Sequence, residues 1–241
     1  MRPPAAVSMG ARRAGTVYRM ITPAQTTYRL NKDIGAVVRP LGFYGTRGTW
    51  SVVTTDGVAQ VNVTRRVMRS VGGGTIFVAV GISVVPVAWW EYLNWRAARW
   101  GQPAIPLDKN ATSYRIGFVE TRQCPEDSYY HLRLDPDRYP ATVTTTEELD
   151  HAAALLVGAA DKLAHTALDL LRPGRYLQAL RGIPDLGGAM WEPLVVLLAE
   201  GGPSAELDAA IEDMRADYAN YGFGPPDMEV EYARMRAAAA A

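Results

Sequence analysis

Residues 48–64, GTWSVVTTDGVAQVNVT, contain the clearest secondary-structure signal in the chain. Asp56 and Gly57 separate two runs rich in valine and threonine, and this dipeptide tolerates the positive φ angles of a tight hairpin turn. In the second run Ala59, Val61 and Val63 alternate with polar residues. The alternation predicts a β-hairpin with one buried and one polar face.

Three further runs extend this hairpin into a sheet. Residues 75–85, TIFVAVGISVV, are apolar on both faces, which is typical of a central strand. Apolar and polar positions alternate in residues 113–120, SYRIGFVE, and again in residues 128–135, SYYHLRLD. Because no long helix separates these runs, we expect an antiparallel sheet of about five strands.

Helices are predicted before and after the sheet-forming region of the sequence. Thr22 and Pro23 form a favourable helix start, and Gly42 ends that helix. A long helix is expected after the capping box of Thr145 and Glu148, with an apolar stripe that includes Leu149, Leu156, Leu163 and Leu170. Helices are expected next at about 175–181, 189–200 and 204–220, the last with Ser204 as its N-cap. The predicted fold class is α+β: an N-terminal helix packed on the antiparallel sheet, followed by an α-helical C-terminal extension.

The chain is expected to divide into four parts. Residues 1–19 are charged but lack an apolar core segment, so they predict a disordered arm or a start-site artefact and no secretory signal. Residues 20–172 form the α+β domain, and residues 173–225 form a helical extension packed on it. Residues 226–241 have few apolar anchors and predict a weakly anchored tail.

Composition limits the class of protein. Hydrophobic residues make up 48% of the chain and charged residues 21%, which is typical of a globular protein. The single cysteine, Cys124, excludes an intramolecular disulfide and favours a cytoplasmic location. The longest apolar run, residues 75–90, is interrupted by Pro86 and is shorter than the ~18 residues that a transmembrane helix needs, so none is expected.

The net charge of zero conceals an asymmetry. Residues 1–122 contain 16 Lys and Arg against 5 Asp and Glu, whereas residues 123–241 contain 9 against 20. The basic half has the charge to attract an anionic partner, or the two halves attract each other and pack together. We favour the second interpretation.

The order of short motifs along the chain resembles that of an uncharacterised bacterial domain family of unknown function. The motifs are LGF (41–43), DGVAQVNV (56–63), VAVGISVVP (78–86) and RIGF (115–118). The resemblance covers about residues 24–170. It implies a compact α+β domain and no particular catalytic residue, cofactor or reaction. The chain departs from the family pattern after RIGF, where SYYHL replaces a tryptophan-rich stretch.

No motif in the sequence names a reaction or a cofactor. Gly72–Gly74 lack the Gly-Lys-Ser/Thr ending of a phosphate loop and precede a strand. Asp161, His165 and Asp169 share one helix face, but no second histidine stands at metal-ligand spacing. Nothing fixes Cys124 close to His131, so a nucleophile and its base are not indicated. We therefore predict neither a metal nor a cofactor, and no catalytic residue.

Four of the six tryptophans lie between Trp89 and Trp100. On a helix, Trp89, Leu93 and Trp100 share one face and are expected in the core, with Trp90 at its edge. Trp95 lies on the other side, where it is either covered by the C-terminal helices or exposed beside Arg99. An exposed tryptophan beside an arginine is a plausible contact for a protein partner.

The preferred hypothesis is a non-catalytic, cytoplasmic binding protein with a protein partner. One alternative is a small-molecule enzyme that uses Arg115, His131 and Arg133 on the polar sheet face. That face either binds an anionic or hydrogen-bonding ligand or is simply the side of the sheet exposed to water, and we favour the second interpretation. A second alternative, single-stranded nucleic-acid binding by the Trp and Arg residues, has no recognised motif to support it. The candidate binding residues are Trp90, Trp95, Arg96, Arg99, Arg115, His131 and Arg133.

Overall fold

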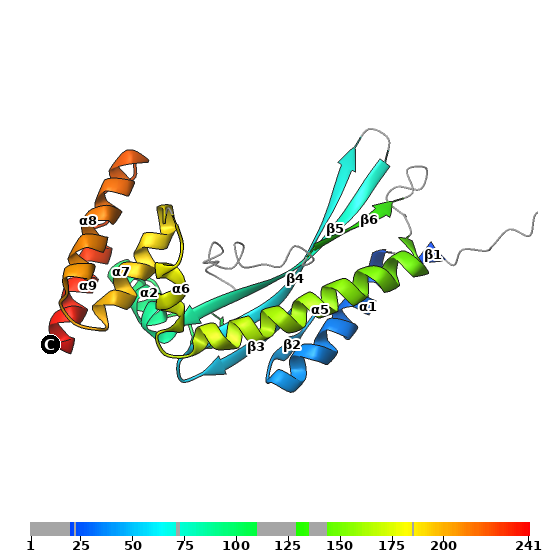
Figure 1. Cartoon of the computed structure of the whole chain (residues 1–241), viewed down its shortest axis with the longest axis horizontal. Helices are drawn as coiled ribbons and strands as arrows, with labels where there is room; N and C mark the ends of the chain where they lie inside the picture. The colour runs from blue at the N-terminus through cyan, green and yellow to red at the C-terminus, as the bar shows by residue number, and fades with distance from the viewer. Residues whose placement is uncertain (1–19, 22, 71–72, 110–128, 135–143, 185) are drawn as a thin grey trace, which may run out of the picture.

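The computed structural model describes residues 20–21, 23–70, 73–109, 129–134, 144–184 and 186–241. It has an α+β fold in which a twisted antiparallel sheet carries helices along one face. A group of helices lies at one end of that sheet (Figure 1). The predicted order of an N-terminal helix, a sheet and then further helices is confirmed.

The sheet is built around the predicted hairpin. Its strands, in spatial order, are β2 (Tyr44–Thr46), β3 (Thr49–Thr54), β4 (Gly57–Ser70), β5 (Gly73–Pro86) and β6 (Tyr129–Leu134), and all neighbours are antiparallel. Four of these match strands that the sequence predicts, while β2 is a short edge strand that it does not predict. The remaining predicted strand, residues 113–120, lies outside the described residues.

Gly57 shows why the hairpin turn needs glycine. Thr54 pairs with Gly57 across the turn, and Gly57 has a φ of 149°. A Cβ atom at this position would lie 2.2 Å from the backbone oxygen of Val85 on the neighbouring strand. Any other residue at position 57 would clash with β5. The close approach of β5 to this turn therefore depends on the glycine.

Two helices cover one face of the sheet. Helix α5 (Thr146–Leu171) lies along β4, β5 and β6, and helix α1 (Pro23–Val38) packs beside α5 (Figure 1). A 3-10 turn, η1 (Arg39–Leu41), ends α1 at Gly42, which has the left-handed φ of 90° that the sequence predicts for a helix stop. The strands β1 (Met20–Ile21) and β7 (Thr144–Thr145) pair with each other beside these helices. The predicted stripe of α5 is buried, including Leu149, Leu156, Leu163 and Leu170.

Gly158 offers a simple test of α5. It is exposed in the middle of this helix, and a Cβ atom there would meet nothing within 4 Å. Gly158→Ala is expected to raise the free energy of unfolding by about 0.5 to 1 kcal/mol, because alanine loses less backbone entropy in a helix. Urea denaturation followed by circular dichroism measures the change. A destabilised variant would mean that α5 is not a regular helix at this position.

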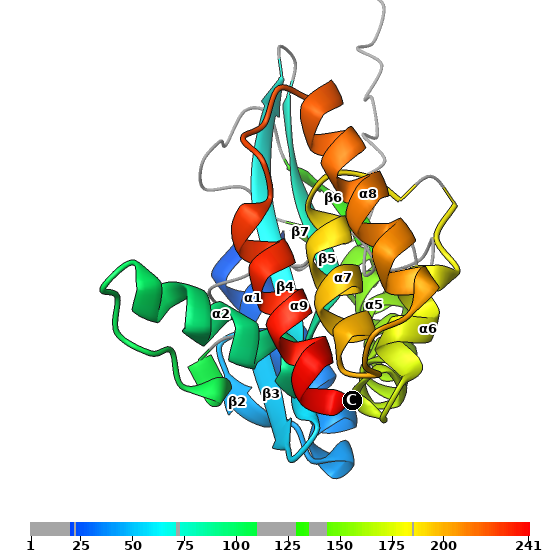
Figure 2. The same ribbon diagram turned by 90° about the vertical axis from the view of Figure 1, so that its left-hand side faces the viewer.

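The remaining helices gather at the end of the sheet where the β3–β4 turn lies. They are α2 (Val87–Arg99), α6 (Arg175–Arg181), η4 (Gly188–Met190), α7 (Trp191–Ala199), α8 (Ala205–Asn220) and α9 (Asp227–Ala240). Ser204 caps α8 as predicted, since its hydroxyl oxygen accepts a hydrogen bond of 3.2 Å from the backbone N–H of Leu207. Figure 2 shows α9 between α2 and α7.

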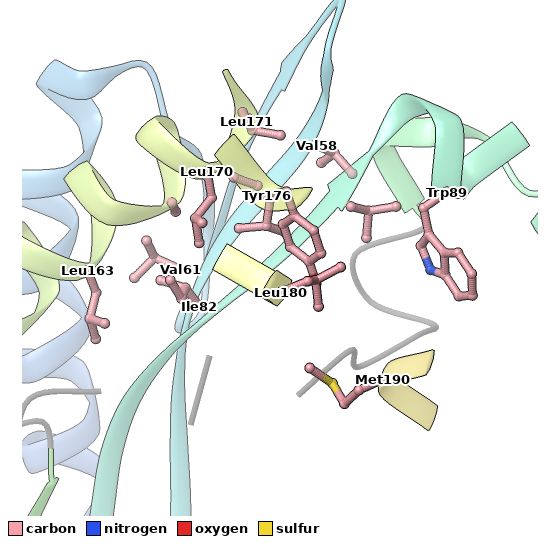
Figure 3. Packing of buried hydrophobic residues seen from close by; sticks show 14 of the residues in the cluster. Val58, Val61, Ile82, Trp89, Leu163, Leu170, Leu171, Tyr176, Leu180 and Met190 are labelled. Atoms are coloured by element: carbon pink, nitrogen blue, oxygen red, sulfur yellow. The ribbon is translucent and has the colours of Figure 1, made fainter. Parts of the chain in front are cut away.

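One continuous core joins the sheet to this helical group. Figure 3 shows Val61 and Ile82 of the sheet near Leu163 of α5, and Tyr176 and Leu180 of α6 near Leu170. Trp89 of α2 and Met190 of η4 belong to the same cluster. The helical extension is therefore packed against the α+β part through apolar side chains. None of the helices in the described part of the chain has the length and apolar character that crossing a bilayer demands.

The structure differs from the prediction of a weakly anchored tail. Residues 227–240 form α9, and Val230, Tyr232, Ala233 and Ala237 are all at most 5% exposed. The helix packs against α7 and α2. Contacts with these neighbours stabilise it more than its own apolar content does. Its most informative buried residue is Glu229, a carboxylate that sequence patterning assigns to the surface.

Candidate protein interaction surface

The structure places one tryptophan of residues 89–100 differently from the prediction. Trp89 is buried, as expected, but Trp100 is 56% exposed and does not belong to the core. Trp100 is the C-cap residue of α2, and its backbone N–H still bonds to the oxygens of Arg96 and Ala97. Its ring therefore lies at the end of the helix, beyond Ala97, which is the last buried residue of α2. The exposed tryptophan of this segment is therefore Trp100.

Trp90 and Trp95 are both half-buried and engaged within the chain. The indole N–H of Trp90 donates a hydrogen bond of 2.7 Å to the backbone oxygen of Ile105. The ring of Trp95 packs against Tyr232 of α9, with ring centroids 5.2 Å apart, and the guanidinium of Arg99 lies 4.3 Å above it. The prediction that left Trp95 either covered or exposed is thus resolved in favour of coverage by a C-terminal helix.

Arg96 lies at the centre of a largely buried polar network. Its Nη1 atom is 3.5 Å from a carboxylate oxygen of Glu192 on α7 and 3.4 Å from one of Glu229 on α9. Tyr92 of α2 donates its hydroxyl hydrogen bond to Glu229, and Tyr218 of α8 donates to Glu192. Two carboxylates therefore share one arginine, and the four helices α2, α7, α8 and α9 all contribute to the network.

Burial decides the protonation states in this network. It raises the pKa of the Tyr92 and Tyr218 hydroxyls above their usual range, and the adjacent carboxylates act in the same direction, so both tyrosines remain donors. Burial also raises the pKa of Glu192, with Glu229 adding to the shift, against the opposing hydrogen bonds from Tyr218 and Arg96. Glu192 is consequently protonated more readily on acidification than a glutamate in water.

The raised pKa of Glu192 predicts a pH dependence of stability. A carboxylate whose pKa is higher in the folded than in the unfolded chain takes up its proton more readily when folded. The network therefore contributes more stability as the pH falls from 7.5 to about 5, above the unfolded pKa of about 4.3. Urea denaturation across this range should show a rising free energy of unfolding, and Glu192→Gln should flatten the rise. Parallel profiles for the two proteins would contradict the assignment.

Ion pairs join the basic and acidic halves of the chain at α2. Besides Arg96, Arg99 pairs with Glu231 of α9, and Glu91 lies 3.2 Å from Arg236, which also binds Glu200. The pairs of Arg96 and Arg99 with glutamates of α7 and α9 support the prediction that the two halves attract each other and pack together. They also mean that Arg96 and Arg99, two candidate binding residues, already have carboxylate partners.

Three exposed aromatic side chains lie beside the network, on two of its sides. Arg96 stacks on the exposed ring of Trp100, with its guanidinium carbon 5.3 Å from the ring centroid. On the other side of the network, Tyr218 contacts Phe223 at 5.6 Å, and Phe223 stacks on Tyr221 at 6.1 Å. Tyr221 and Phe223 are 65% and 57% exposed. We define Trp100, Tyr221 and Phe223 as the aromatic surface.

Tyr221 and Phe223 were not among the candidate residues, although the sequence contains a signal for them. They stand in YGFGPP, residues 221–226, between α8 and α9. Glycine and proline disfavour a helix or a central strand in this segment. Its aromatic rings therefore do not lie on a helix or strand that has one face in the core. Large aromatic residues in such a loop favour a contact surface.

The polar sheet face is only partly as expected. Gln60 and Asn62 pair with Ser83 and Gly81 of β5, and the register of β6 puts His131 and Arg133 at positions on the same face. Gln60 and Ser83 are buried, however, and Gln60 donates a 3.2 Å hydrogen bond to Ser51, so this end of the face is not open to water. Arg115 and Cys124 lie outside the described residues.

The apolar pocket beside α2 and the charged face of α5 are two further places to consider for a small ligand or an ion. An apolar pocket of about 360 Å³ lies between the start of α2 and the end of α5, with Pro86, Ala88, Leu171 and Tyr176 in its wall. On α5, Asp169 binds Arg172 and Arg175, and His165 contacts Asp161 of the preceding turn. In the part of the chain that the structure describes, no three His, Cys, Asp or Glu residues come together as metal ligands do.

No family model matches the chain, and neither a curated protein nor a solved structure matches it.

Proposed function

We propose that this chain is a non-catalytic binding protein that holds a protein partner on the aromatic surface. The observation that carries the proposal is the exposure of Trp100, Tyr221 and Phe223 beside an ion-paired helix junction. Aromatic residues and arginine dominate the binding energy of protein interfaces. The rings already contact Arg96 and Tyr218, and such contacts lower the entropic cost of ordering them on binding.

The geometry favours a protein over a nucleic acid as partner. Single-stranded nucleic acid needs cations that are free to contact phosphates, next to rings on which bases stack. Arg96 and Arg99, the two arginines nearest to Trp100 in the sequence, are both paired with glutamates. A phosphate would have to compete with these carboxylates. The enzyme alternative, which rests on Arg115, His131 and Arg133, stays a prediction.

Site-specific photocrosslinking tests the proposal. A photoreactive phenylalanine at Trp100 or Phe223 is expected to give one discrete protein adduct in cells, which mass spectrometry identifies. The same residue at Val53 is the matched control, because Val53 is an exposed hydrophobic residue of β3, in a different part of the fold. Adducts of equal yield at all three positions would contradict a specific surface.

The identified partner then allows a quantitative test. We expect Trp100→Ala to weaken the affinity for the purified partner at least tenfold, as for a residue that carries about 1.4 kcal/mol or more of binding energy. Stability should change little, because Trp100 is exposed. Val53→Ala should leave the affinity unchanged. An affinity that is unchanged by Trp100→Ala, measured by isothermal titration calorimetry, would overturn the proposal.

A further inference from the structure

The apolar pocket between the start of α2 and the end of α5 has a wall of two kinds. Its buried residues carry no charge and are mostly apolar: Ala88, Leu170, Leu171 and Tyr176. Figure 3 shows the last three of them where α5 is followed by α6. The charged residues of the wall are all exposed: Asp56, Arg172 and Glu200. We define the first set as the floor of the pocket and the second as its rim.

Two of the three rim charges already have a partner of opposite charge. Glu200 accepts hydrogen bonds from Nε and Nη2 of Arg236, at 2.7 and 3.0 Å. Arg172 lies 3.1 Å from a carboxylate oxygen of Asp169. These two charges are therefore compensated within the chain.

Asp56 is the rim residue whose charge is not compensated. Its carboxylate forms neither an ion pair nor a hydrogen bond with any residue that the structure describes. The backbone of Asp56 is held in place, because its oxygen accepts a hydrogen bond of 2.8 Å from the N–H of Val87, the first residue of α2. One negative charge thus remains available at the rim.

The helix ends around the pocket do not alter this balance. Helices α2 and α6 begin at its wall, and helices α5 and α7 end there. The N-terminus of a helix carries a partial positive charge and the C-terminus a partial negative charge. Two ends of each kind oppose one another, so the side chain of Asp56 decides which charge a ligand needs.

We infer that this pocket binds a small amphipathic amine, with its apolar part on the floor and its ammonium group beside Asp56. An apolar chain gains free energy by leaving water for the floor, and an ammonium group donates charge-assisted hydrogen bonds to a carboxylate. The pocket volume of about 360 Å³ holds about 12 non-hydrogen atoms, each taking the volume of one water molecule in the liquid.

This inference is independent of the proposed function. None of Trp100, Tyr221 and Phe223 lines the pocket. A bound amine therefore leaves the aromatic surface free for a protein partner.

An NMR titration of the ¹⁵N-labelled full chain with octylamine tests the inference. The amide signals of Gly174 and Gly201, which line the pocket, should shift on binding. Those of Gly101 and Gly222, next to the aromatic surface in the sequence, should not shift. Butylamine should bind at least about tenfold more weakly, because its shorter chain leaves part of the floor in contact with water. Unshifted signals of Gly174 and Gly201 would overturn the inference.

The charge of the head group is tested with 1-octanol and octanoate, which have the same chain length. Octylamine should bind most tightly of the three and octanoate most weakly. Asp56→Asn should lower the affinity for octylamine about twofold to fivefold, as for an ion pair near the surface, and should not change the affinity for octanol. Asparagine suits the same turn, so the hairpin is retained.

Asp213→Asn is the matched control for Asp56→Asn. It removes an equal charge from an exposed position of α8, a helix that does not line the pocket. Both affinities should stay unchanged in this variant. An octylamine affinity that is unaffected by Asp56→Asn, or an octanoate affinity equal to that of octylamine, would overturn the inference.

Filling the floor tests the position of the apolar chain. Ala88→Leu adds three carbon atoms to the floor and should abolish the binding of octylamine and octanol alike. Circular dichroism checks that the variant is folded, and Leu177→Trp, at a half-buried position of the same wall, replaces it if it is not. Full binding in a folded variant would overturn the inference. Photocrosslinking at Trp100 should be unaffected, so it reports separately on the proposed function.

Discussion

Replacing Arg96 with methionine is expected to lower the free energy of unfolding by about 3 kcal/mol, since the change leaves two largely buried carboxylates without their cation. The side chains of Arg96, Glu192 and Glu229 are only 15%, 18% and 10% exposed, so water screens the remaining repulsion weakly. Methionine keeps most of the apolar stem of arginine but lacks the guanidinium that lies over the rings of Tyr92 and Trp100. The expected loss is therefore mainly electrostatic, and urea denaturation followed by tryptophan fluorescence measures it.

Arg99→Met is the matched control for this prediction. Arg99 belongs to the same helix and also pairs with a glutamate of α9, but both side chains are about half exposed. An exposed pair contributes about 0 to 1 kcal/mol, so this variant should lose at most that amount. Adding Glu192→Gln to Arg96→Met should recover part of the lost stability by removing one unpaired carboxylate. Equal losses for Arg96→Met and Arg99→Met would show that the network is not electrostatically important.

Tyr232→Ala is expected to destabilise the protein by a similar amount, about 3 kcal/mol, through the loss of packing. Tyr232 is 3% exposed, and its ring contacts those of Tyr92 and Trp95 at 5.1 and 5.2 Å. The truncation leaves a cavity between α2 and α9, and Trp95 loses its cover. We expect a lower urea midpoint together with a red shift of the tryptophan emission.

Met235→Ala provides the comparison on the same helix. Met235 is 48% exposed and lies three residues after Tyr232, so its truncation should change the stability by no more than about 0.5 kcal/mol. If Tyr232→Ala were equally mild, α9 would be no more than the weakly anchored tail that the sequence predicts. The pair of variants thus measures how firmly the C-terminal helix is held.

Local signals predicted the parts of the fold that depend on nearby residues. Asp56 and Gly57 specify the β3–β4 turn through their own backbone preferences, and Ser204 caps α8 through a neighbour three residues away. Each of these features needs only a short stretch of chain. The stripe of α5 likewise follows from helical spacing alone.

Features that depend on distant partners could not be predicted in this way. Tyr92 and Glu229 are 137 positions apart, and nothing in either local stretch indicates that they meet. The burial of α9 follows from α2 and α7, not from its own composition. Trp100 follows the helical rotation but caps α2 beyond the last buried residue, Ala97, and helical spacing does not indicate how far along α2 the neighbouring elements extend.

The long sequence separation within the Arg96 network has a consequence for the order of folding during synthesis. Arg96 and its partner Glu229 are 133 positions apart, so the ribosome releases α2 long before α9 exists. Strands β3, β4 and β5 are joined by tight, local connections and have what they need to form first. Arg96 and the aromatic rings of α2 therefore stay uncovered until α9 has been synthesised. The packing of α9 on α2 is consequently a late step of assembly.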